Sequence, residues 1–198
     1  SRNPRADSSE RRHCRGRKRR LMLGFIKNIF RRRYLKKAIS TNPTGLHPLS
    51  EIKSVSIIID MEDSGADECK EKAISVFKSL GIRTSVYFFD FSKKDEDERQ
   101  TTSLNNTILR SDLNWCGRPS AEKLSMLVQE DSDMLLSLVD NDDFPIEYMA
   151  KCSPSRFKIG RCQLPGRTFD LVIEDSPSQA YTPVQAFAEI TRYLETIK

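Results

Sequence analysis

The sequence predicts an α/β protein: a three-layer, Rossmann-like sandwich in which helices cover both faces of a mostly parallel sheet of about five or six strands. From residue 54 onward, short apolar runs of strand length alternate with segments whose apolar residues recur at helical spacing. The 198 residues also suffice for one domain of this kind with an appendage. We expect that appendage to include a basic helix before the first strand.

Composition divides the chain into four parts. Residues 1–21 are polar, Arg-rich and start without methionine, so we expect a disordered basic extension outside the fold. Residues 22–40 combine apolar and basic side chains at helical spacing, which predicts a basic amphipathic helix. Residues 41–53 open on Thr-Asn-Pro-Thr-Gly and form a linker. Residues 54–198 form a single α/β domain.

The first half of this domain contains its longest predicted elements. Val55–Asp60 is a strand, because consecutive β-branched residues indicate a buried strand. Ser64 is expected to cap the following helix, with Asp67 in the third helical position, and Gly81 is expected to end it. Arg83–Asp90 is rich in β-branched and aromatic residues and is the second strand.

The second half of the domain is expected to repeat this alternation with shorter elements. In chain order the strands are Asn106–Leu109, Met134–Val139, Arg156–Gly160 and Asp170–Glu174, and the helices between them are 119–128 and 145–151. The last helix has the clearest start signal in the chain. Thr182 is its expected N-cap, with Pro183 in the first position and Gln185 as the capping-box partner.

Positive charge is concentrated at the N-terminus, although the net charge of the chain is only +5. Residues 1–40 carry 15 Lys or Arg against two acidic residues, whereas residues 41–198 carry 18 basic and 26 acidic residues. The body would therefore repel a polyanion, while the basic end predicts an anionic partner. The five cysteines include no C-x-x-C pair, which indicates reduced thiols in a cytoplasmic protein.

The expected helix over residues 22–40 is the strongest candidate binding element. We predict that its basic residues contact an anionic partner: Lys27, Arg31, Arg32, Arg33, Lys36 and Lys37. The helix either lies on an anionic membrane surface, which would place the protein peripherally at the membrane, or grips RNA phosphates. A third interpretation is that apolar residues such as Phe25 and Phe30 pack on the domain and leave the cations in solvent. No segment has the length of a transmembrane span.

Carboxylates follow several of the expected strands, at the edge where open parallel sheets bind ligands. If their loops meet, four of them predict a Mg²⁺ site: Asp60, Asp140, Asp142 and Asp175. Mg²⁺ prefers oxygen ligands and commonly borrows substrate phosphates, so this alternative is a Mg²⁺-dependent phosphate-handling enzyme. The competing interpretation is that acidic residues simply end strands and begin helices. We expect the acids after the first strand mostly not to meet those of other strands.

The sequence lacks the residues that nucleotide-binding and histidine-dependent catalytic sites require. Gly65 stands alone after the first strand, so the glycine patterns of dinucleotide and P-loop sites are missing, and no dinucleotide is expected. The only histidines, His13 and His47, precede the α/β domain, which leaves Cys116 without a histidine base in the domain. We therefore expect Cys116 to pack, and we expect no catalytic residue and no cofactor apart from Mg²⁺ in the alternative.

A second basic group lies late in the domain. It consists of Arg156, Lys158 and Arg161. Two interpretations explain this group equally well: the side chains bind an anion, or they point from an edge strand into water.

Four stretches resemble an uncharacterised family of bacterial α/β proteins, a domain-of-unknown-function family with no assigned activity. They are residues 25–37 (FIKNIFRRRYLKK), 112–117 (DLNWCG), 133–160 and 169–173 (FDLVI). The resemblance implies a compact single domain over most of residues 25–198 and supplies no catalytic residue. The segment 133–160 is also similar, at the level of the fold, to one half of heptosyltransferase-like glycosyltransferases, in which a strand, a small helix and a strand ending in glycine recur.

Taken together, these features favour a cytoplasmic, non-enzymatic binding or scaffolding module. Its basic N-terminal helix would contact an anionic partner or surface. The alternative is the Mg²⁺-dependent phosphate-handling enzyme with carboxylates at the carboxyl ends of its strands.

Overall fold

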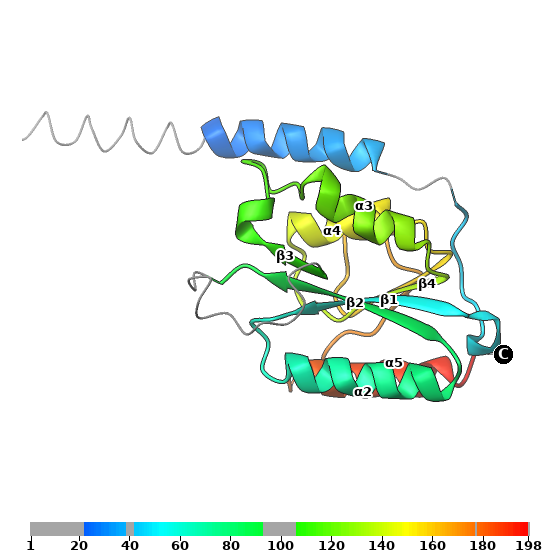
Figure 1. The fold of residues 1–198 in the computed structure, drawn as a ribbon. Helices are drawn as coiled ribbons and strands as arrows, with labels where there is room; N and C mark the ends of the chain where they lie inside the picture. Colours follow the sequence, from blue (N-terminus) through cyan, green and yellow to red (C-terminus); the bar gives the residue numbers. More distant parts are fainter. Residues whose placement is uncertain (1–21, 39–41, 93–105, 177, 198) are drawn as a thin grey trace, which may run out of the picture.

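The computed structural model describes residues 22–38, 42–92, 106–176 and 178–197 (Figure 1). The extension expected over residues 1–21 lies outside these ranges. The described part contains a six-stranded sheet in the order β3-β2-β1-β4-β5-β6, and all its strand pairs are parallel. The strands are β1 Ser54–Asp60, β2 Arg83–Asp90, β3 Thr107–Leu109, β4 Met134–Ser137, β5 Phe157–Gly160 and β6 Leu171–Val172. The predicted α/β fold with a parallel sheet is confirmed.

Helices cover both faces of the sheet (Figure 1). They are α2 Ala66–Ser79, α3 Ala121–Glu130, α4 Phe144–Cys152 and α5 Pro183–Leu194, with 3₁₀ turns η1 Leu49–Glu51 and η4 Arg110–Asp112. Helices α2 and α5 lie on one face, and α3 and α4 lie on the other. The N-terminal helix, residues 22–37, precedes the sheet as expected and lies across the outside of α3 and α4 (Figure 1).

The strand order reverses between β1 and β4. The chain runs outward from β1 through β2 to β3, then returns to the other side of β1 and runs outward through β4, β5 and β6. In open parallel sheets such a reversal brings together the loops that follow the two central strands, and ligands bind there. The loops after β1 and β4 therefore define the edge of the sheet at which a site is most expected.

Strand β1 shows how one segment fills both layers of the core. Side chains alternate between the two faces of a strand, so Ile57 and Ile59 pack with Phe77 of α2 and Phe187 of α5, while Ile58 packs in the layer of α3 and α4. The three isoleucines are completely buried. Burying a side chain of this size contributes about 1.5–3 kcal/mol, so this alternation is a main source of stability.

The helix ends confirm one predicted cap and correct another. Thr182 and Gln185 form the expected reciprocal capping box at the start of α5. Helix α2, however, begins after Gly65, which has φ 86° and provides no side-chain cap, so the predicted Ser64 cap is wrong. The chain turns through the left-handed region at Gly65, which leaves Ser64 one residue too early to cap the helix. Gly81 ends α2 with φ 72°, as predicted.

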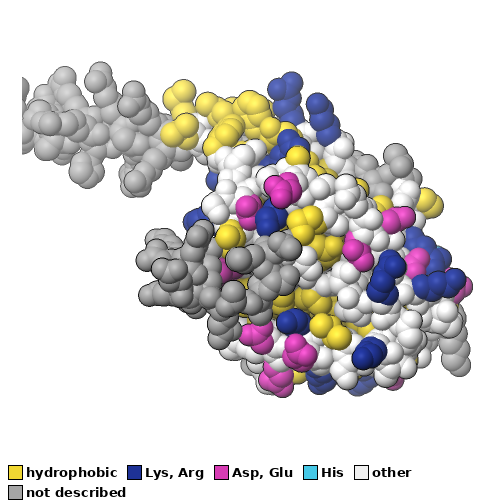
Figure 2. Space-filling view, viewed as in Figure 1, with side chains coloured by type: hydrophobic (Ala, Val, Ile, Leu, Met, Phe, Trp, Pro, Cys, Tyr) yellow, Lys and Arg dark blue, Asp and Glu magenta, His cyan; other side chains and the backbone are white. Residues whose placement is uncertain are grey.

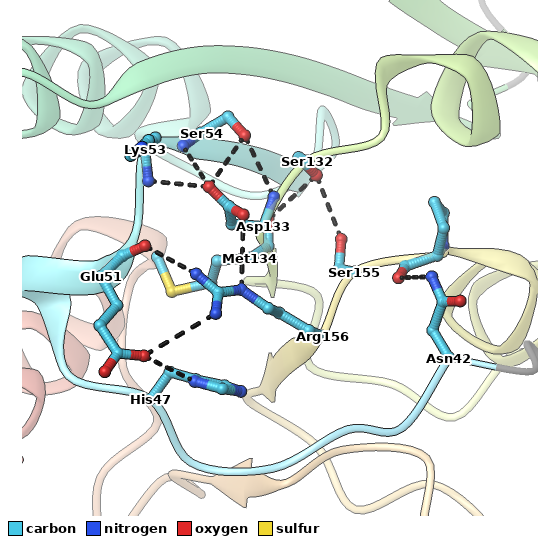
Figure 3. Close-up of polar contacts among 11 residues, drawn as sticks. Asn42, His47, Glu51, Lys53, Ser54, Ser132, Asp133, Met134, Ser155 and Arg156 are labelled. Carbon is cyan, nitrogen blue, oxygen red and sulfur yellow. Dashed lines mark hydrogen bonds and ion pairs between the residues drawn. The ribbon is translucent and has the colours of Figure 1, made fainter.

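A polar network joins the amino-terminal ends of β1, β4 and β5 (Figure 3). Asp133 accepts hydrogen bonds from the amides of Lys53 at 2.8 Å and Ser54 at 3.2 Å. Arg156 lies 3.4 Å from the same carboxylate and donates to the carbonyl of Glu51 at 2.7 Å. Burial raises the pKa of Asp133, but these amides and Arg156 outweigh it and hold the pKa below its ordinary value. Arg156 thus holds strand starts together.

The end of β5 has no room for a side chain. A Cβ at Gly160 would lie 2.2 Å from the ring of Phe169. We predict that Gly160→Ala lowers the free energy of unfolding in urea by about 1–3 kcal/mol, because the ring and strand must separate. The control is Gly45→Ala, whose Cβ would meet nothing within 4 Å. Equal stability of the two variants would contradict the prediction.

Candidate functional site

Carboxylates from three loops meet at the carboxyl edge of the sheet, around the guanidinium of Arg161. Arg161 follows β5, and only 2% of its side chain is exposed. It donates two hydrogen bonds to Asp175, of 2.9 and 2.8 Å, in the bidentate geometry that suits a carboxylate. Asp63 after β1 lies 3.7 Å from it, and Asp140 after β4 lies 3.9 Å from it. The guanidinium also donates to the carbonyl of Tyr181.

The structure brings together three of the four carboxylates predicted to bind Mg²⁺. Asp140 and Asp175 share Arg161, and Asp60 is close enough to Asp140 for the two negative charges to repel. Asp142 is exposed. The expectation that acids after β1 mostly avoid those of other strands is wrong, because a parallel sheet places all these strand ends at one edge.

The geometry of this group favours an ion cluster built around an arginine. Within residues 22–38, 42–92, 106–176 and 178–197, no three His, Cys, Asp or Glu side chains are grouped so that they could hold a metal ion. Arg161 supplies the positive charge that several carboxylates need at close range, and both oxygens of Asp175 accept hydrogen bonds from it. The Mg²⁺ interpretation stays a prediction, tested below.

Asp63 carries the least compensated negative charge of the cluster. Its Oδ2 atom is buried and accepts no hydrogen bond from the described residues. Burial is the main cause that raises the pKa of Asp63 to about 6, followed by the charges of Asp140 and Asp60, with Arg161 opposing them. The folded protein therefore favours protonated Asp63 at a pH where an exposed aspartate is ionised.

Two members of the predicted basic patch on β5 are buried. Strand β5 lies between β4 and β6, so the interpretation of an edge strand is wrong. Lys158 is 4% exposed, and its ammonium donates to the carbonyl of Ala150 at 2.9 Å. Burial lowers the pKa of Lys158 to about 8. Sequence reasoning missed the roles of Lys158 and Arg161 because the position of a strand within a sheet is not a local property of the chain.

The N-terminal helix is anchored to the domain by aromatic contacts in its second half. The ring of Phe30 meets that of Trp115 edge-on at 5.3 Å, and Tyr34 meets Tyr148 of α4 at 6.3 Å. Leu35 packs in the same small cluster as Tyr148. The helix therefore rests on α4 and on the loop that contains Trp115.

Two arginines strengthen this anchor. Arg31 donates from Nε to the carbonyl of Cys116 at 2.7 Å and lies over the ring of Phe144 at 4.9 Å. Arg118 lies over the ring of Tyr34 at 4.8 Å. Gly117 has φ 89°, which strains any other residue, and a Cβ there would lie 3.1 Å from Arg31 and crowd its side chain. Cys116 is buried in this contact, in agreement with the packing role expected from the sequence.

The N-terminal helix presents different residues inward and outward, because residues three and four positions apart share a face. Lys27 and Arg31 lie on the inward face and are half-buried. The outward face is apolar in its first half and basic in its second. In chain order it consists of Met22, Phe25, Ile26, Ile29, Arg32, Arg33, Lys36 and Lys37, all of them exposed. Figure 2 shows hydrophobic side chains gathered at the start of this helix and Lys and Arg standing out near its end.

This arrangement divides the predicted set of anion-binding residues in two. Arg32, Arg33, Lys36 and Lys37 face away from the domain, whereas Lys27 and Arg31 face it. The interpretation that the apolar face packs on the domain holds for Tyr34 and Leu35. It fails for Phe25, which is 68% exposed.

Sequence comparison places the chain in a family. Residues 27–197 match the model of a family of unknown function (DUF6913), and the chain belongs to that family, as its motifs suggested. The match spans most of the N-terminal helix as well as the sheet. Comparisons with curated proteins and with solved structures gave no match, so neither a bacterial origin nor the likeness to heptosyltransferase-like enzymes gains support. No helix of the described residues is long and apolar enough to cross a membrane.

The raised pKa of Asp63 predicts a loss of stability as the pH rises. Between about 4, the ordinary value, and about 6, the folded state binds more protons than the unfolded state, so a higher pH favours unfolding. We predict that Asp63→Asn gains a few degrees of melting temperature relative to the wild type across this window. Glu68→Gln, which removes an exposed carboxylate nearby, is the control. A wild-type-to-variant difference that does not change with pH would contradict the prediction.

The Arg161 cluster also predicts the response to divalent metal. Because Arg161 already occupies the centre of this group, and the described residues contain no three metal-ligating side chains grouped to hold an ion, we expect millimolar Mg²⁺ or Mn²⁺ to leave the melting temperature of the wild type unchanged. Thermal melts of the wild type and of Asp140→Asn/Asp142→Asn measure this. A metal-dependent rise in the wild type that the double variant lacks would instead establish the Mg²⁺ alternative.

Proposed function

We propose that this protein is a non-enzymatic binding module whose N-terminal helix attaches it to an anionic membrane surface. The observation that carries the proposal is the outward face of the helix, where exposed apolar residues are followed by four exposed cations. Met22 and Phe25 are 65% and 68% exposed, and a group of exposed apolar side chains of this kind is typical of an interaction site.

A membrane surface accounts for both halves of that face. Phe25 and Ile29 would enter the boundary between headgroups and acyl chains, and Arg32 and Lys36 would meet lipid phosphates. RNA would use the cations alone and leave the apolar half in water. A membrane surface therefore accounts for more of the outward face than RNA does.

The rest of the molecule suits attachment through one helix. The anchor formed by Phe30 and Tyr34 fixes the helix on α4, so binding would also fix the orientation of the domain. Residues 41–198 carry more acidic than basic groups and are repelled by anionic lipid. Contact with anionic lipid would thus be confined to residues 1–40, where the positive charge is concentrated, and would depend on ionic strength.

We predict that Lys36→Glu/Lys37→Glu weakens binding to phosphatidylcholine vesicles that contain phosphatidylserine. Each basic residue near such a surface contributes about 1 kcal/mol, so loss of the two alone should cost roughly 30-fold in affinity. Co-sedimentation at low and high salt measures the change. The control is Lys72→Glu/Lys78→Glu, which makes the same charge change on exposed residues of α2, across the sheet.

The apolar half of the outward face provides a test that distinguishes membrane binding from RNA binding. Phe25→Ser should weaken vesicle binding through lost apolar burial, whereas contact with RNA phosphates should not depend on Phe25. If the wild type binds single-stranded RNA but not anionic vesicles, or if the α2 control loses as much affinity as the helix variant, the membrane proposal is wrong.

A further inference from the structure

A second surface of the N-terminal helix closes a pocket that is separate from its outward face. The pocket has a volume of about 400 Å³ and lies between the inward face of the helix, the loop that contains Trp115 and the start of α4. Its other walls are Phe91, which follows β2, and Arg110, which follows β3. It therefore lies at the carboxyl edge of the sheet, where open parallel sheets bind ligands.

The pocket is lined by more positive than negative charge. Among the described residues that line it, Lys27, Arg31 and Arg110 contribute cations, and Asp143 contributes one carboxylate. This leaves an excess of two positive charges, which matches a phosphate monoester near neutral pH. A carboxylate would compensate only half of that excess.

Both arginines of the pocket are held in place by backbone carbonyls. Arg31 donates from Nε to Cys116 at 2.7 Å, and Arg110 donates from Nε to Phe91 at 3.1 Å. These are the hydrogen bonds that the two guanidinium groups make to the described residues, and both leave the Nη atoms for another acceptor. Planar guanidinium groups fixed in this way are suited to phosphate oxygens.

Aromatic side chains supply an apolar wall beside these cations. Trp115 lines the pocket and is 59% exposed, although its edge-on contact with Phe30 holds the ring in position. Phe91 lines it as well. Pockets for small molecules commonly combine apolar walls of this kind with a few placed polar groups.

We propose that this pocket binds a small phosphate monoester, with the phosphate between Lys27, Arg31 and Arg110 and an apolar, planar group against Trp115. The proposal does not rest on membrane attachment, because the pocket and the outward face use different residues of the helix. Lys27 and Arg31, which the sequence predicts to contact a membrane or RNA, would instead bind a small ligand.

The experiment uses benzyl phosphate as the probe and the fluorescence of Trp115, the single tryptophan of the chain, as the readout. Saturable quenching is expected in the wild type. Lys27→Gln and Arg110→Gln should each weaken it by about tenfold or more, because each removes a charged contact to phosphate. Lys36→Gln is the matched control: it makes the same change as Lys27→Gln on the outward side of the same helix and should leave the affinity unchanged.

Further probes define the chemistry of the ligand. Benzoate should bind more weakly than benzyl phosphate, and benzyl alcohol should give no saturable quenching. Quenching that is not saturable, equal affinity for benzyl alcohol, or equal loss in Lys27→Gln and Lys36→Gln would overturn the proposal.

Vesicles that contain phosphatidic acid distinguish a lipid source of the phosphate from a soluble one. If Lys27→Gln lowers vesicle affinity and benzyl phosphate competes with the vesicles, the monoester in the pocket is a lipid headgroup. If vesicle binding is unchanged in Lys27→Gln while benzyl phosphate binding is lost, the ligand is soluble. Both results support phosphate binding in the pocket, and the second does so even if membrane attachment fails.

Discussion

The ion cluster around Arg161 is the interaction on which the carboxyl edge of the sheet depends. A parallel sheet brings every strand end to one edge, and this chain places carboxylates after β1, β4 and β6. Without a cation among them, these carboxylates would repel one another in a partly buried site. Arg161 provides that cation from the end of β5. Arg161 compensates Asp63 least, and the pKa of Asp63 is raised because burial and the neighbouring carboxylates outweigh the attraction of Arg161.

The same edge separates into two regions of opposite character. At the switch point between β1 and β4, acids surround a buried arginine that is already engaged with protein groups. Toward β2 and β3, Arg110 and the inward side of the N-terminal helix line an open, cationic pocket. In the first region Arg161 is paired with protein carboxylates, although Asp63 keeps a buried oxygen that accepts no hydrogen bond from the described residues. The second has charges that the protein holds in place and does not neutralise, which is the condition for binding an anion.

The N-terminal helix links the fold to both proposed activities. Its anchor on Trp115 and Tyr148 makes it part of the domain, and the family match accordingly spans most of it together with the sheet. A basic segment that looks in the sequence like one binding element is divided by this docking into an inward and an outward face. Four of its cations are left for a surface, and two are turned toward a pocket.

The sequence by itself determined the layers and placed most elements to within about two residues, because strand alternation, helical spacing and caps such as Thr182 are local properties of the chain. It also located the basic helix and the acids that follow β1, β4 and β6. Only the tertiary structure decided which of these groups meet. Strand order placed β5 inside the sheet, buried Lys158 and Arg161, and gathered Asp63, Asp140 and Asp175 around one guanidinium. Helix docking turned Lys27 and Arg31 inward. These outcomes depend on contacts between residues far apart in the chain, which local patterns do not encode.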